Sequence, residues 1–323
     1  MDGIDRVEVS KGGLALAQHI APVYFDNPKV RVVMVGGSVS RGCADQYSDL
    51  DIGVFWAEPP SDEERKLLIQ RAGAELLSFE PYTADSEWGA GEHWGMSEVV
   101  INSQQYTGAL MISVNHSTVT AMEKCLTDVV ERYDTSLDKQ SLIAAVQHGI
   151  PLCGPEALET WQQKAAYPDE LARRMVRENL WFGPWFNPEA YLARNDLLVL
   201  YQHFIWLEQG LLKVLAGLNR IYYPSSEHKW MERLIDEMYI VPPNLASRMK
   251  GIFRADPTSG WHQLKELIDE TILLVEAHMP EVDLVSPGDA HPQVNIAWAK
   301  RRWEPYAAYS LMRGIGVAYA GGA

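Results

Sequence analysis

Hydrophobic residues recur along the chain with two different periods, and the change of period predicts how the chain is organised. In the first part they form short, β-branched runs, which is the pattern of buried strands. Strands are predicted over four segments: Val30 to Val35, Asp51 to Trp56, Glu98 to Asn102 and Ala109 to Val114.

Helical spacing of apolar residues surrounds these runs. It predicts helices over Gly12–Tyr24, Ser38–Ala44, Ser61–Leu77 and Thr118–Tyr133. The third of these begins with a capping-box pattern, in which Ser61 is followed three residues later by Glu64. The resulting order of helices and strands is that of a small α/β (α+β) domain with a mixed sheet.

Beyond Ser136 the strand pattern ends, and long helical periods separated by Pro and Gly take over. The predicted helices are Asp138–His148, Glu156–Ala166, Pro168–Asn179, Glu189–Ala216, Lys229–Glu237, Asn244–Ile252 and Gly260–His278. We therefore expect an α/β domain over residues 1–136 and an α-helical bundle domain over residues 137–323.

Composition and charge narrow the classes of partner. The 323-residue chain is 47% hydrophobic and 22% charged, as globular proteins are. Its formal net charge of -15 would repel a phosphate backbone, so we expect no nucleic-acid partner. A cationic or neutral small substrate is more compatible with this charge, although acidity also promotes solubility.

Three widely spaced cysteines, Cys43, Cys125 and Cys153, suit a reducing compartment better than a disulfide scaffold. The first residues lack the basic and apolar regions of a signal peptide. Apolar runs are too short to span a bilayer, so we expect no membrane partner and a cytoplasmic location. The sequence leaves the oligomeric state open.

One constellation carries candidate chemistry. Gly36-Gly37-Ser38 follows the first predicted strand, and Asp49-Leu50-Asp51 leads into the second. Two glycines let the backbone turn sharply and approach a ligand, and a helix starting at Ser38 would offer N–H groups to a phosphate. Neither half is specific alone, since a plain turn or a strand end explains each, but the two in this order are far more informative.

The two aspartates suit a metal. Residues i and i+2 of a strand point to the same face, so Asp49 and Asp51 should project together. Like charges repel, and a divalent cation would remove that repulsion. Mg²⁺ prefers oxygen ligands and commonly joins one or two carboxylates to substrate phosphates. The pair therefore predicts a Mg²⁺ site that assists displacement at phosphorus.

The stretch from Gly36-Gly37-Ser38 through Arg41 to Asp49-Leu50-Asp51 resembles the nucleotidyltransferase superfamily, with its polymerase-β-like catalytic fold. Aminoglycoside and lincosamide nucleotidyltransferases, which pair this domain with a helical bundle, are among its members. The segment from Leu218-Asn219-Arg220 to Lys229-Trp230 resembles the helical half of uncharacterised bacterial proteins with this domain.

The resemblance implies transfer of a nucleoside monophosphate, usually AMP from ATP, to a hydroxyl of an acceptor. Pyrophosphate is released, and a small-molecule acceptor makes antibiotic modification one possibility. The triphosphate would be held by Gly36, Gly37, Ser38 and Arg41, and the metal by the two aspartates. Lys229 could reach the triphosphate as a point charge, or could be a solvated helix start.

The superfamily usually adds a third carboxylate from a later strand, as metal ligand or general base. In the run Leu110–His116, Ser113 stands where that acid is expected. Glu98 is our candidate for the role, with Glu92 and His116 as alternatives. The departure also leaves open a second function, a nucleotide-binding or regulatory protein with little or no turnover. No zinc site is expected, because His93 and His116 lack a second histidine at ligand spacing.

Overall fold

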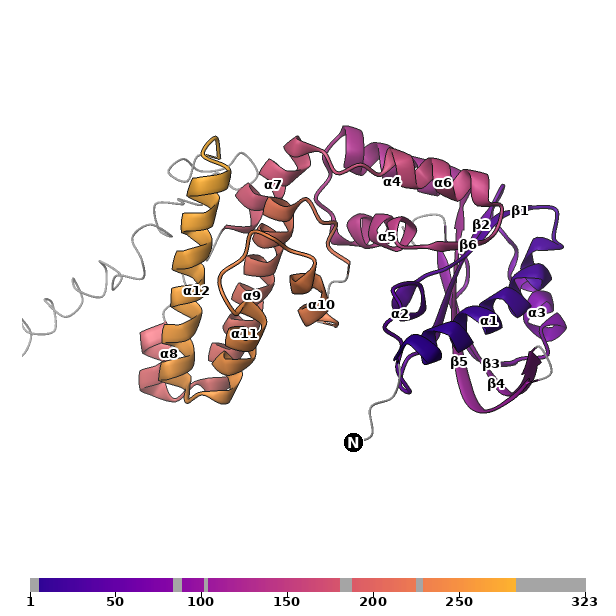
Figure 1. Cartoon of the computed structure of the whole chain (residues 1–323), viewed down its shortest axis with the longest axis horizontal. Coiled ribbons are helices and arrows are strands. Elements are labelled where there is room, and N and C mark those ends of the chain that lie inside the picture. The colour runs from indigo at the N-terminus through magenta and orange to yellow at the C-terminus, as the bar shows by residue number, and fades with distance from the viewer. Residues whose placement is uncertain (1–5, 84–88, 102–103, 181–187, 225–228, 283–323) are drawn as a thin grey trace, which may run out of the picture. The chain divides into compact units, whose positions relative to one another are not determined.

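The computed structural model describes residues 6–83, 89–101, 104–180, 188–224 and 229–282. Figure 1 shows the chain coloured from the N-terminus to the C-terminus. It divides into two compact units. The first comprises residues 1–168 with 222–226, and the second comprises residues 169–221 with 227–323.

A mixed sheet forms the centre of the first unit. Its strands are β1 (Val30–Val35), β2 (Leu50–Trp56), β3 (Glu75–Phe79), β4 (Ala90–Ile101), β5 (Gln104–Thr118) and β6 (Ile150–Cys153). They lie in the order β3-β4-β5-β2-β1-β6. Strands β2 and β5 pair in parallel, and the other neighbours pair antiparallel. The predicted mixed sheet is confirmed.

The helices of the first unit are α1 (Arg6–Phe25), α2 (Gly37–Ser40), α3 (Asp62–Arg71), α4 (Val119–Leu126), the π-helix η1 (Thr127–Glu131), α5 (Leu137–Gln147) and α6 (Pro155–Lys164). One hydrophobic core joins α1 and α3 to the sheet, with Ile20, Ile52, Ile112 and Trp94 at its centre. These two helices therefore define the core face of the sheet, and α2 lies at the end of β1 (Figure 1).

The second unit is helical in its described part. Its helices are α7 (Asp169–Asn179), α8 (Pro188–Arg194), α9 (Leu197–Asn219), α10 (Met231–Asp236), α11 (Leu245–Arg254) and α12 (Pro257–His278). Helix α9 packs on α7 and α12, and Phe204 and Trp261 lie in the buried interior. The predicted α-helical second part is confirmed. The aromatic residues 181–187 and the basic cluster 300–302 lie outside the described residues.

Several elements differ from the sequence prediction, among them α3, β3 and β6. Helix α3 ends at Arg71 rather than Leu77, because Gly73 has φ +70 and turns the chain into β3, which the sequence did not indicate. Strand β6 was also missed, since it has only four residues and contains Pro151. Because β6 pairs with β1, the predicted domain boundary at 136/137 falls inside the first compact unit.

Among the described helices, none combines the length and apolar character that crossing a bilayer requires.

Candidate active site

The glycine turn lies directly against the second aspartate. The Gly36 N–H donates to the Asp51 carbonyl over 2.9 Å, which fixes the turn at the start of β2. Gly37 has φ +58, a left-handed conformation that favours glycine. A Cβ atom placed on Gly37 would lie 1.7 Å from Asp51 Oδ2, so the carboxylate occupies the space that a side chain would need. The turn and the carboxylate are thus one constellation.

The strand pattern of β2 turns Asp51 away from the core. Leu50 and Ile52 are buried in the core that α1 covers, whereas Asp51 between them is partly exposed. Asp49 precedes β2 by one residue and is also partly exposed. The alternation that the sequence predicted is therefore present at Leu50, Asp51 and Ile52.

A pocket of about 800 Å³ opens beside Asp49. Its walls come from the first half of α1, from residues 45–49 and from Leu110 and Met111 of β5, all within the first unit. Tyr47, at its rim, is 86% exposed. The volume lies within the range of small-molecule sites, roughly 300–1,000 Å³. The pocket is lined by Asp49 and by the core-face residues Leu16 and Leu50, but Asp51 and Gly37 are not among its lining residues.

Ser113 takes the place of the third carboxylate. In the parallel pairing of β2 and β5, Asp51 stands opposite Ser113. Residues opposite each other in a sheet share a face, so an acid at 113 would project beside Asp51. Ser113 is 7% exposed and supplies only a hydroxyl there.

The structure does not bring Glu98 to this position. Glu98 is exposed on β4 and pairs with Thr107. The β4 residue aligned with Ser113 is His93, five positions earlier, which corresponds to roughly 16 Å along a strand. The expectation that Glu98 replaces the missing acid therefore has no support in the register.

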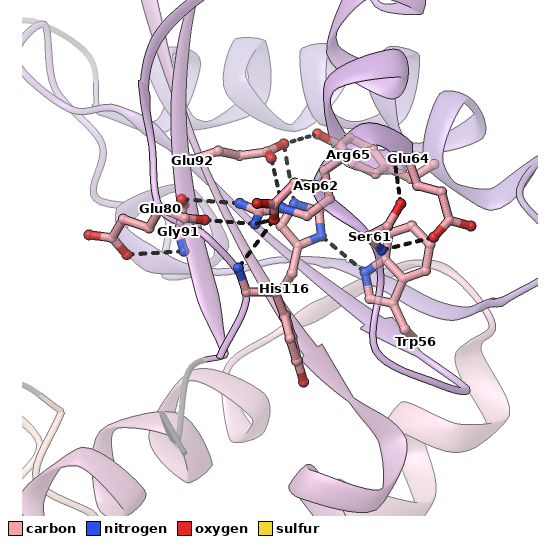
Figure 2. Close-up of polar contacts among 11 residues, drawn as sticks. Trp56, Ser61, Asp62, Glu64, Arg65, Glu80, Gly91, Glu92 and His116 are labelled. Atoms are coloured by element: carbon pink, nitrogen blue, oxygen red, sulfur yellow. Dashed lines mark hydrogen bonds and ion pairs between the residues drawn. The ribbon is translucent and has the colours of Figure 1, made fainter. Parts of the chain in front are cut away.

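Glu92 and His116, the two alternatives, lie on the core face and are fully buried. Glu92 accepts from the Tyr24 hydroxyl of α1 over 2.9 Å and from Arg65 Nε of α3 over 3.2 Å. Arg65, also fully buried, donates to the carbonyls of Glu80 and Gly91. Figure 2 shows Glu92, Arg65 and His116 close together, with Glu80 and Gly91 beside them. Both alternatives are therefore structural, on the side of the sheet opposite Asp51.

The protonation state of His116 follows from its neighbours. Trp56 Nε1 donates to His116 Nδ1 over 3.0 Å, so Nδ1 carries no proton and the ring is the neutral Nε2–H tautomer. Nε2 lies 3.2 Å from Glu92 Oε1, at an angle short of a regular hydrogen bond. Burial lowers the pKa of His116 despite the nearby carboxylate. Burial opposes ionisation of Glu92, but His116, Arg65 and Tyr24 outweigh it and hold its pKa below the usual value.

The remaining predicted ligands of the triphosphate are less well defined. Ser38 is buried in α2, which has only four residues, so its first N–H groups rather than a helix macrodipole would meet a phosphate. Arg41 directly follows this helix and is partly exposed. Lys229 is exposed and belongs to the second unit. The roles of Arg41 and Lys229 stay predictions.

The donor set suits Mg²⁺ rather than a metal held by protein alone. Within the described residues there is no group of three or more His, Cys, Asp or Glu side chains arranged to hold a metal. Asp49 and Asp51 offer carboxylate oxygens, and Mg²⁺ characteristically takes one or two carboxylates and completes its shell with water and substrate phosphates. The residues present therefore fit that ion.

Comparisons with known proteins agree with this geometry. Residues 20–86 match the family model described as "Nucleotidyltransferase domain", which includes both the glycine turn and the aspartates. Residues 135–231 match "Domain of unknown function (DUF4037)". Residues 20–86 thus carry a nucleotidyltransferase domain. A comparison with curated proteins finds no match.

Solved structures share little sequence with the chain. A nucleotidyltransferase-like protein from Exiguobacterium sibiricum 255-15 is 10% identical, with 83% of this chain and 79% of that one covered, at a TM-score of 0.36. The Cid1 poly(U) polymerase is 13% identical, with 43% of this chain and 40% of Cid1 covered, at a TM-score of 0.25. The chain thus spans less than half of Cid1, and the nucleotidyltransferase assignment rests on the family model and the site.

Proposed function

We propose that the chain transfers a nucleoside monophosphate, AMP from ATP, to a hydroxyl of a small-molecule acceptor and releases pyrophosphate. The observation that carries this proposal is the contact between Gly37 and Asp51, which joins a candidate phosphate turn to a candidate metal ligand. The nucleotidyltransferase domain defines the class of reaction. AMP as the transferred group, the acceptor and a cytoplasmic location go beyond what that class defines.

The residues have distinct roles in this reaction. Asp49 and Asp51 would hold Mg²⁺, which neutralises phosphate charge and thereby favours displacement at the α-phosphorus. Gly36 and Gly37 would form the turn that faces the triphosphate, and position 37 has no room for a side chain because a Cβ atom there would collide with the Asp51 carboxylate. The Ser38 hydroxyl and the first N–H groups of α2 would bind phosphate oxygens.

A small acceptor is supported by the pocket beside Asp49 and by the charge of the chain. The pocket holds about 800 Å³, which suits a drug-sized molecule. The net charge of -15 disfavours an RNA or DNA acceptor and tolerates a cationic one. An aminoglycoside or lincosamide is therefore a reasonable first acceptor to test.

The direct test is pyrophosphate release from each of the four common nucleoside triphosphates with Mg²⁺. The acceptor panel would hold an aminoglycoside, a lincosamide, glycerol, a serine- and tyrosine-containing peptide and an RNA oligonucleotide. We expect ATP with a small hydroxyl acceptor to give the highest rate, and Asp51→Asn to abolish it. Equal rates for wild type and Asp51→Asn would refute the proposal.

Ser113 favours a second candidate, a nucleotide-binding regulatory protein without turnover. The hydroxyl at this position replaces a carboxylate that most members of the superfamily use. Calorimetry separates the two functions. Micromolar binding of ATP and Mg²⁺ that depends on Asp51, combined with no pyrophosphate release on the whole panel, would identify the regulatory protein.

A further inference from the structure

A row of polar side chains crosses three adjacent strands beside the aspartates. Asp51 of β2 stands opposite Ser113 of β5, and Ser113 stands opposite His93 of β4. On β3 the row continues with Ser78, which pairs with His93. Sequence reasoning considered His93 only as a zinc ligand, because its position relative to Asp51 depends on the pairing of strands far apart in the chain.

The rows on either side show which face this row occupies. Leu50, Ile112 and Trp94 form the row before it, and all three are buried in the core. Ile52, Val114 and Glu92 form the row after it, where Glu92 meets Tyr24 of α1. Because side chains alternate along every strand, Asp51, Ser113 and His93 project from the opposite face.

Strand spacing sets the distance between the two ends of the row. Neighbouring strands lie about 4.8 Å apart, so the Cα atoms of Asp51 and His93 are separated by roughly 10 Å. The residue between them is Ser113, which is 7% exposed and has a short side chain. An acceptor hydroxyl beside Asp51 would therefore have an imidazole as the next side chain along the row.

The contact with Ser78 orients the ring. His93 Nδ1 lies 2.8 Å from the Ser78 hydroxyl oxygen, so Nε2 is the nitrogen left to face a substrate. His93 is partly exposed, unlike His116. Among the described residues, charged groups on its face include Asp51, the exposed Glu75 of β3 and the exposed Glu80, which directly follows β3. Glu80 Oε2 accepts from the Gly91 N–H over 3.2 Å, two residues along β4 from His93.

We propose that His93 is the general base of the transfer, in the role that a third carboxylate has elsewhere. His93 Nε2 takes the proton of the acceptor hydroxyl while the acceptor oxygen bonds to the α-phosphorus. The bond from that phosphorus to the β,γ-diphosphate breaks, pyrophosphate leaves with the electron pair, and the imidazolium later gives its proton to water. This role rests on the proposed function.

The test compares His93→Gln with the matched variant His19→Gln. His19 is exposed on α1, which covers the other face of the sheet, so its replacement controls for loss of an imidazole from the same unit. Activity is measured as pyrophosphate release from ATP and Mg²⁺ with the best acceptor of the panel above. General-base catalysis contributes about 100-fold or more, so His93→Gln should lower kcat by at least that factor.

Two further readouts separate a base from a structural residue. His93→Gln should leave the KM for ATP and the melting temperature near those of wild type, and should remove the acid limb of the pH dependence of kcat. The double variant His93→Gln/Ser113→Asp, which restores a carboxylate in the same row, should recover part of kcat. His19→Gln should keep both the wild-type kcat and the acid limb of its pH dependence.

The outcomes distinguish this inference from the function on which it rests. If wild type turns over, and His93→Gln matches it in kcat and keeps the acid limb, His93 is not the base although the transferase function stands. If His93→Gln loses ATP affinity or melts much earlier, its role is structural. If neither wild type nor Asp51→Asn releases pyrophosphate with any acceptor, both proposals fail.

Discussion

Glu92 and Asp51 are both carboxylates near the middle of the same sheet, yet they lie on opposite faces and in opposite surroundings. Glu92 is fully buried and contacts Arg65, Tyr24 and His116. Asp51 is partly exposed and packs against the bare backbone of Gly37. The first carboxylate is enclosed by protein partners, whereas the second borders a turn that leaves space for a ligand.

The same contrast appears between two histidines. His116 is fully buried, and its Nδ1 accepts from the indole N–H of Trp56, so the ring is enclosed by protein partners on the core face. His93 follows Glu92 directly in the sequence but points to the other face, where Ser78 orients it. The comparison teaches that position relative to the faces of the sheet, rather than residue type, separates structural from candidate catalytic groups.

The largest expected effects are a loss of stability when Glu92 is replaced and a loss of turnover when Asp51 is replaced. Glu92→Gln removes the buried ionised partner of Arg65, whose remaining acidic partner among the described residues is the partly exposed Asp62 at 3.5 Å. Breaking a buried pair costs about 3–5 kcal/mol of unfolding free energy. Asp51→Asn should hardly change stability but should lower pyrophosphate release by about 1,000-fold, or roughly 4 kcal/mol of activation free energy. Urea unfolding and turnover, measured on both variants, check this prediction.

Glu98→Gln is the matched control for Glu92→Gln and for Asp51→Asn. Glu98 is exposed on the same strand as Glu92, so its replacement should change the unfolding free energy by no more than about 0.5 kcal/mol. We also expect it to keep wild-type turnover, since its register does not place it near Asp51. A large loss of activity in Glu98→Gln would show that this part of β4 approaches the site after all.

A smaller effect is expected at the glycine turn. Gly37→Ala puts a methyl group into the space of Asp51 Oδ2 and strains a left-handed residue. Gly73→Ala, also at positive φ, meets nothing within 4 Å, so it isolates the strain alone. Both variants should lose about 1–2 kcal/mol of stability, and only Gly37→Ala should lose about 100-fold in turnover through displacement of Asp51.

Turnover and urea unfolding of the two alanine variants provide the measurement. An equal loss of turnover in both would mean that backbone strain, and not contact with the carboxylate, sets the activity.

The smallest expected effect is the contribution of His116, on the core face, to the pH dependence of the unfolding free energy. The pKa of His116 is lowered in the folded protein, whereas an unfolded histidine titrates near about 6.5. Below that pH the unfolded chain binds a proton that the folded chain does not. The unfolding free energy should therefore fall as the pH drops from about 7.5 to 5.5, by at most about 1.4 kcal/mol per pH unit from this group.

Urea unfolding at several pH values, on wild type and His116→Gln, measures this contribution. The variant should show a shallower slope below neutral pH, although it is less stable overall. Identical slopes would mean that His116 takes up its proton equally in both states. Glu92 adds a separate loss of unfolding free energy at lower pH. Its pKa is depressed in the folded protein, so the stability that it contributes disappears as Glu92 is protonated.

The sequence by itself determined the local parts of the protein. The β-branched run Val30–Val35 became β1, and the capping box of Ser61 and Glu64 starts α3 as predicted. The glycine turn and the aspartates were identified because their chemistry lies within sixteen consecutive residues. Short-range spacing fixes such features, since the residues that interact are close in the chain.

Only the tertiary structure decided the features that depend on strand pairing. From the sequence, Glu98 was the candidate for the third acidic position, with Glu92 and His116 as alternatives, and His93 was considered only as a metal ligand. The register of β4 and β5 showed which of these residues share a face with Asp51. A one-residue step along a strand moves a side chain to the opposite face, and the sequence does not state which strands become neighbours. The physical reason is that register is set by the burial of whole rows of side chains, here Leu50–Ile112–Trp94, contributed by segments far apart in the chain.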